Sequence, residues 1–156
     1  KIKTIISCTG DNPFIDPVYI DKMIKFHKIK NLEFTRCIDL PFGTFAYAID
    51  HNAIQKACEI KGTSDTENWV GYFTNTGIFK HGILSVDDEY LRWPDLRLTV
   101  DTKEDFNLIS IIFKELGKNG RIFSLHEIVD FINKNPHLRK INQNIKQRKS
   151  KPIKLK

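Results

Sequence analysis

The opening stretch, residues 4–17, limits the fold of this chain more than any other segment. A short apolar run indicates a buried strand that stops at Gly10, and Asp11 is the first charge after that strand. Asp16 can cap a helix that Pro17 opens at its first position. In open α/β sheets, ligands bind outside the carboxyl ends of the strands, so Asp11 is well placed to hold a metal or a ligand hydroxyl.

A second acid stands in the same context far along the chain. Residues 96–100 alternate in hydrophobicity and carry β-branched side chains, which predicts a strand, and Asp101 follows directly. Residues 102–105 then have the pattern of a capping box at the start of a helix. Magnesium is commonly bound by one or two carboxylates together with substrate phosphates. We therefore predict that Asp11 and Asp101 are the metal ligands and the catalytic pair.

The two motifs together resemble those of a known family. Residues 10–17 (Gly-Asp-Asn-Pro-Phe-Ile-Asp-Pro) and 97–106 (Arg-Leu-Thr-Val-Asp-Thr-Lys-Glu-Asp-Phe) resemble the sugar-acid cytidylyltransferases that act on N-acetylneuraminate or 3-deoxy-manno-octulosonate. The similarity is strongest to the spore-coat polysaccharide biosynthesis branch, and it runs from Thr4 to about Asn142. It implies an α/β, Rossmann-like nucleotide-diphospho-sugar transferase fold, with a mixed sheet and flanking helices.

By this resemblance, the protein is a Mg²⁺-dependent cytidylyltransferase that transfers CMP from CTP to a sugar or sugar acid for surface polysaccharide biosynthesis. The resemblance also implies that the N-terminal part of the enzyme, with the glycine- and basic-rich loop for the triphosphate, is missing from this chain. Residues 1–138 are then the acceptor- and metal-binding part of a single nucleotidyltransferase domain. The sequence leaves open the acceptor, the nucleotide, the formation of a homodimer, and whether this part folds alone.

Further candidate substrate contacts lie at three places. In the resembled family, a proline–glycine turn before a strand lies near the acceptor sugar, and Gly43 and Thr44 occupy that place here. An ordinary connection between strands explains this turn equally well. The spore-coat branch typically has an acid-histidine-valine-threonine pattern near residue 67. This chain has the acid, Glu67, but not the histidine and threonine, which leaves the acceptor identity open. Arg97 can bind a phosphate or sugar carboxylate in a bidentate manner, or it can neutralise Asp101 or a surface acid.

The remaining pattern alternates between helical and extended segments. We expect helices at residues 17–29, 51–61, 67–73, 102–116 and 125–134, and strands at residues 33–38, 44–49 and 77–86. The helix at 102–116 is predicted to bury one face, formed by Phe106, Ile109, Ile112, Phe113 and Leu116.

The net charge of +6 comes from the C-terminus. Residues 139–156 hold eight of the 25 basic side chains and none of the 19 acids, so residues 1–138 carry 17 basic and 19 acidic side chains. We interpret residues 139–156 as a solvated, flexible tail. Binding to RNA or a membrane surface is the alternative, but no aromatic residues interleave with the charges to stack on bases, so nucleic acid is not expected as a partner.

Cysteine usage and hydropathy indicate a cytoplasmic protein. Cys8, Cys37 and Cys58 are widely spaced in apolar runs, which favours small buried thiols in a reducing compartment. No apolar stretch approaches the roughly 20 residues that a membrane helix needs, so no membrane span is expected.

Two other classes of protein compete with the cytidylyltransferase. A metal-dependent glycosyltransferase would also place acids at strand ends, but it would show a DxD-type spacing, for which residues 87–89 (Asp-Asp-Glu) are the only nearby imitation. A non-catalytic interaction domain would use the basic tail to bind an anionic partner, and its binding would fall steeply with salt.

Overall fold

The computed structural model describes residues 2–65, 67–147 and 150–156. Within these ranges, the strands form one mixed sheet in the order β1-β3-β2-β4. Strand β3 pairs antiparallel with both β1 and β2, whereas β4 runs parallel to β2. The mixed α/β architecture expected from the sequence is therefore confirmed. The strands are β1 (Thr4–Ser7), β2 (Phe34–Cys37), β3 (Tyr47–Asp50) and β4 (His81–Leu84).

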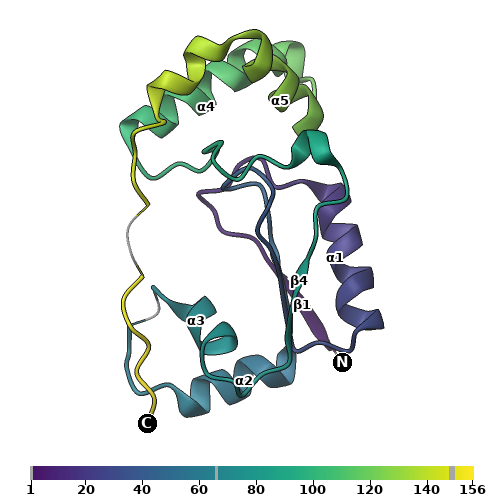
Figure 1. Cartoon of the computed structure of the whole chain (residues 1–156), viewed down its shortest axis with the longest axis vertical. Coiled ribbons are helices and arrows are strands. Elements are labelled where there is room, and N and C mark those ends of the chain that lie inside the picture. The colour runs from purple at the N-terminus through teal and green to yellow at the C-terminus, as the bar shows by residue number, and fades with distance from the viewer. Residues whose placement is uncertain (1, 66, 148–149) are drawn as a thin grey trace.

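Helices lie on both faces of this sheet and beyond one of its ends (Figure 1). Side chains alternate between the faces along each strand. Thus Cys37 and Ala48 face the core that includes α1, whereas Phe34 and Ile49 face α2 and α3. The helices are α1 (Pro17–Ile29), α2 (His51–Ile60), α3 (Trp69–Thr74), α4 (Lys103–Leu116) and α5 (Leu125–Lys134), with short 3₁₀ helices at Glu89–Leu91, Lys118–Gly120 and Pro136–Ile141.

Local capping chemistry fixes where three of these helices begin. The Asp16 carboxylate accepts hydrogen bonds from the main-chain N–H groups of Val18 and Tyr19, at 2.8 and 3.0 Å, directly before α1. Helices α4 and α5 each begin with a complete capping box, formed by Thr102 with Asp105 and by Ser124 with Glu127. Each cap satisfies N–H groups that have no partner inside the helix. The predicted starts of these helices are confirmed.

The predicted strand at residues 96–100 is wrong. Arg97 forms only an isolated parallel bridge with Phe42, through hydrogen bonds from Phe42 N to Leu96 O (2.8 Å) and from Leu98 N to Phe42 O (2.7 Å). Directly after Phe42, Gly43 adopts a φ of 95° and turns the chain away, so the pairing stops. Leu96, Arg97, Leu98 and Thr99 are all buried, so the alternation does not mark one buried and one exposed face.

The C-terminal segment lies against the body of the domain. Residues 150–156 run along α2 and α3, where the yellow trace ends in Figure 1. Gly62 N donates to Lys154 O (2.8 Å), Lys156 N donates to Ile60 O (3.0 Å), and Tyr72 Oη donates to Lys154 O (2.9 Å). The sequence predicted a solvated tail because the basic side chains can be identified from the sequence, whereas these main-chain contacts cannot. The boundary after residue 138 stays a prediction.

Two further expectations concern the cysteines and the membrane. Cys37 is buried as expected, but Cys8 and Cys58 are exposed, so the expected burial is wrong for these two. Among the described residues, no helix has both the length and the apolar character that a membrane crossing requires.

Candidate functional site

The loop after β1 and the segment before α4 meet through their main chains. Val100 N donates a hydrogen bond to Asp11 O at 2.9 Å, and Thr99 Oγ1 donates to the same carbonyl at 3.3 Å. As a result, Asp11 and Asp101 both line one cleft, with a volume of about 820 Å³. The structure thus brings together the two aspartates that the sequence separates by 90 positions.

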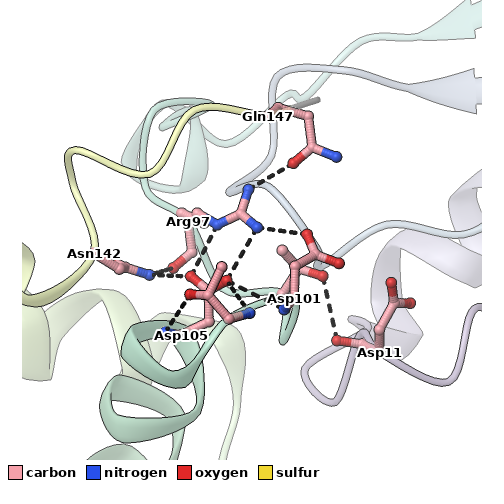
Figure 2. Close-up of polar contacts among 8 residues, drawn as sticks. Asp11, Arg97, Asp101, Asp105, Asn142 and Gln147 are labelled. Atoms are coloured by element: carbon pink, nitrogen blue, oxygen red, sulfur yellow. Dashed lines mark hydrogen bonds and ion pairs between the residues drawn. The ribbon is translucent and has the colours of Figure 1, made fainter. Parts of the chain in front are cut away.

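The two aspartates differ in their surroundings. Asp101 accepts a hydrogen bond from Arg97 on Oδ2, which leaves Oδ1 for another partner, and Figure 2 shows its side chain turned toward Arg97. None of the other residues drawn in Figure 2 bonds to the Asp11 carboxylate. Carboxylate oxygens are the ligands that Mg²⁺ prefers, and binding of magnesium by this pair stays a prediction. The described ranges contain no group of three or more metal-ligating side chains, so substrate or water oxygens would complete the coordination.

Arg97 is largely buried, with 8% of its surface exposed, and its donors are directed at protein acceptors. Nε and Nη2 donate to the two oxygens of Asp105, at 2.8 and 3.0 Å, Nη2 also donates to Asp101, and Nη1 donates to Gln147 Oε1 at 2.6 Å. Arg97 does not line the cleft. It lies on the side of Asp101 that faces away from Asp11 (Figure 2). The geometry therefore favours the neutralising role. Direct contact of Arg97 with substrate stays a prediction.

Asp105 and Asn142 complete this network, and sequence reasoning missed their part in it. Asn142 Nδ2 donates to Asp105 Oδ1 (2.9 Å) and to Arg97 O (3.1 Å), and both side chains are buried. Burial alone would raise the pKa of Asp105, but the hydrogen bonds from Arg97 and Asn142 hold that pKa below its ordinary value. A signal was present in the sequence, because Arg97 and Asp105 belong to one short motif of opposite charges.

Of the two residues predicted for the acceptor turn, Gly43 and Thr44, only Gly43 lines the cleft. The Gly43 backbone approaches residue 99 so closely that a Cβ atom would lie 2.6 Å from Thr99 N. Thr44 is fully buried, and its hydroxyl donates to Pro41 O within the same turn, at 2.8 Å. Contact of Gly43 with the acceptor therefore remains a proposal, and the Thr44 hydroxyl is occupied in shaping the turn.

Glu67 lines the same cleft from the side of α3. Its carboxylate pairs with Lys151 Nζ at 3.1 Å, and Asp65 pairs with the same amine at 2.9 Å. The cleft is also lined by residues from the range 139–156, among them Gln147, Lys151 and Ile153. The segment interpreted as a tail therefore forms part of the cleft wall.

Arg36 and Tyr47, on neighbouring strands, are cleft residues that sequence reasoning missed. Burial raises the pKa of Tyr47, the nearby Arg36 cation opposes this rise, and the Asp11 carboxylate adds to it. Both charges therefore lie near the Tyr47 phenol. No sequence motif identified Arg36, because a single arginine in a short strand has no distinguishing spacing.

The acidic run at residues 87–89 lies away from this site. Asp87 accepts hydrogen bonds from Tyr19 Oη (2.9 Å) and from Lys22 Nζ (2.6 Å). Burial and the bond to Asp87 raise the pKa of Tyr19 to about 12. Asp88 caps the 3₁₀ helix that follows and pairs with His126 at 2.8 Å. Asp87 and Asp88 are used in scaffold contacts, and none of the three acids lines the cleft.

Comparison with known proteins relates the fold and the sequence to other chains. A solved cytidylyltransferase from Leptospira borgpetersenii serovar Hardjo-bovis superposes with a TM-score of 0.76 and 24% identity, over 95% of this chain and 62% of that one. The spore coat polysaccharide biosynthesis protein SpsF of Bacillus subtilis is 30% identical over 139 residues, which cover 87% of this chain and 57% of that protein. An uncharacterized protein of Methanocaldococcus jannaschii is 29% identical over 153 residues, covering 96% and 61%. No family model matches the chain.

The mixed sheet and its flanking helices define an α/β domain with the nucleotide-diphospho-sugar transferase fold of cytidylyltransferases. The chain spans about three fifths of the length of the curated relatives it matches, at 57% and 61%. As the two motifs predicted, the fold matches that of a cytidylyltransferase, and the sequence is similar to a spore coat polysaccharide biosynthesis protein.

Proposed function

We propose that this chain is the acceptor- and metal-binding part of a Mg²⁺-dependent cytidylyltransferase that makes a CMP-sugar for surface polysaccharide biosynthesis. One observation carries the proposal: the main-chain hydrogen bond from Val100 to Asp11 sets Asp11 and Asp101 in a single cleft. The likeness to a spore-coat polysaccharide protein and to a solved cytidylyltransferase supports the reaction type.

The residues of this chain would act by position and charge. Asp11 and Asp101 would hold Mg²⁺, which supplies neutralisation of the phosphate charge when it is bound. Arg97 fixes Asp101 from behind, so this carboxylate can keep one oxygen directed to the cleft. Gly43 lets the acceptor turn approach residue 99 closely and so shapes the cleft beside Asp101. In the proposed reaction, the sugar hydroxyl attacks the α-phosphate of CTP and pyrophosphate leaves.

The test is pyrophosphate release by the complete protein with Mg²⁺, each of the four nucleoside triphosphates, and a panel of sugars and 2-keto sugar acids. We expect turnover with CTP, and we expect Asp11→Asn and Asp101→Asn each to reduce it by about two orders of magnitude or more. Asp87→Asn is the matched control, because Asp87 contacts Tyr19 and Lys22 outside the cleft. Activity that survives in both cleft variants would show the metal assignment to be wrong.

The same control separates the proposal from a glycosyltransferase. An enzyme that used the acidic run at residues 87–89 would lose activity in Asp87→Asn and would require a nucleotide-sugar donor. The positions of these side chains, in contact with α1 and α5, favour the cytidylyltransferase.

A further inference from the structure

The cleft contains a cation that the proposed metal site does not use. Among the residues that the structure describes, two cationic side chains, Arg36 and Lys151, line it. Lys151 is paired with Asp65 and Glu67. In contrast, the Nε–H of Arg36 is buried and has no hydrogen-bond partner in the part of the chain that the structure describes.

The sheet directs Arg36 toward the cleft. Residues two apart on a strand share a face, so Arg36 lies on the same face of β2 as Phe34. Phe34 packs against Phe73 and Trp69 of α3, which places this face beneath that helix. Arg36 therefore stands where the aromatic packing under α3 ends and the polar cleft begins, on the opposite side from α1.

A buried donor without an acceptor destabilises a fold, because the N–H group has lost its water and gained nothing in exchange. Such groups are rare in native proteins and need a specific explanation. The guanidinium edge that carries Nε–H matches the oxygens of a carboxylate or phosphate, with which arginine forms paired, charge-assisted hydrogen bonds. An anion that enters the cleft would satisfy this donor.

We propose that Arg36 is a substrate-anchoring residue, which binds a carboxylate or phosphate group in the cleft through its Nε–H edge. This inference rests on the proposed function in taking the cleft as the substrate site. It adds an anion contact on the wall of β2, whereas Asp11 and Asp101 lie on the loop after β1 and the segment before α4. Arg36 would then orient the substrate while the aspartates hold the metal.

The test is calorimetric binding to the complete protein, without turnover. The probes are inorganic pyrophosphate, N-acetylneuraminate, 3-deoxy-manno-octulosonate and the methyl esters of the two sugar acids, which lack the carboxylate charge. We expect the wild-type protein to bind pyrophosphate or a sugar acid, and Arg36→Met to weaken that binding at least tenfold. Loss for pyrophosphate alone identifies a phosphate subsite. Loss for a sugar acid, with the weak binding of its ester unchanged, identifies a carboxylate subsite.

Arg121→Met is the matched control, because Arg121 is an exposed arginine that pairs with Glu127 and does not line the cleft. It should bind every probe as the wild type does. Arg36→Met should also melt no lower than the wild type, because it removes an unsatisfied donor. The proposal fails if Arg36→Met binds all anions at wild-type affinity, if the wild type binds none of them, or if the variant only loses stability. None of these readouts depends on cytidylyl transfer, so the proposed function can fail separately.

Discussion

Arg97 and Asp105 form a bidentate pair in which Nε and Nη2 of the guanidinium each donate to one oxygen of the carboxylate. Both side chains are buried, and Asp105 also accepts from the main-chain N–H groups of Asp101 and Thr102, at 3.1 Å each. One carboxylate therefore begins α4, holds the arginine behind Asp101 and fixes the main chain of Asp101 itself.

Asp105→Asn should strongly destabilise the domain. Removing one partner of a buried ion pair leaves the other charge uncompensated, and the cost is typically about 3–5 kcal/mol. Asp101 still contacts Arg97 in this variant, so we expect a loss near the lower end of that range. Urea denaturation measures it. Asp130→Asn is the control, because Asp130 pairs with Lys134 at the surface, and its effect should be much smaller.

The stability that Asp105 contributes should depend on pH. Its pKa in the folded protein lies below the ordinary value of about 3.9, so the unfolded chain takes up the proton first as the pH falls. The contribution is therefore complete above this ordinary pKa and is lost as the pH falls below it. Urea unfolding between about pH 7 and about pH 3 should show wild type and Asp105→Asn converging at the acid end. A constant difference would contradict the assignment.

Gly43→Ala should destabilise the fold and distort the cleft. Gly43 has a φ of 95°, and an added Cβ would lie 2.6 Å from Thr99 N. Backbone strain alone costs about 1–3 kcal/mol, and the contact adds to it. Gly10→Ala is a matched control, because no atom lies within 4 Å of its added Cβ, and its effect should stay within about 0.5 kcal/mol. Thermal denaturation of the two variants compares them directly.

Deleting residues 150–156 should loosen α2 and α3 without unpairing the sheet. The deletion removes the hydrogen bonds that join Gly62 to Lys154, Lys156 to Ile60, and Tyr72 to Lys154. Each such bond contributes about 1 kcal/mol net. Hydrogen exchange should show lost protection of the Gly62 amide, with the amides of β3 still protected. Unchanged protection at Gly62 would mean that the segment does not hold this region.

The predictable parts of the fold were those fixed by neighbouring residues. Asp16 with Pro17, and Thr102 with Asp105, mark helix starts through main-chain groups only two or three positions away. Such chemistry is visible in any single sequence. Asp11 and Asp101 were singled out because each follows a short apolar run, although the run before Asp101 is not a strand.

The parts that could not be predicted depend on contacts between distant segments. Helix α4 was expected to bury Phe106, which is 61% exposed, whereas Leu108 is fully buried in its place. The helical period fits several rotations about the axis, and only packing against α5 selects one of them. Arg36 was missed for the same reason. Its Nε–H becomes buried only in the folded protein, where β2 packs beside α3.

The placement of residues 150–156 has a consequence for synthesis of the protein. These residues are synthesised about 90 positions after residues 60–62, to which they bond. Chains fold from the N-terminus as they are made, at about 5–20 residues per second, so the sheet and α2 can form while this part of the cleft wall is still absent. Binding of a substrate that needs the complete wall would then begin only after residues 150–156 have left the ribosome.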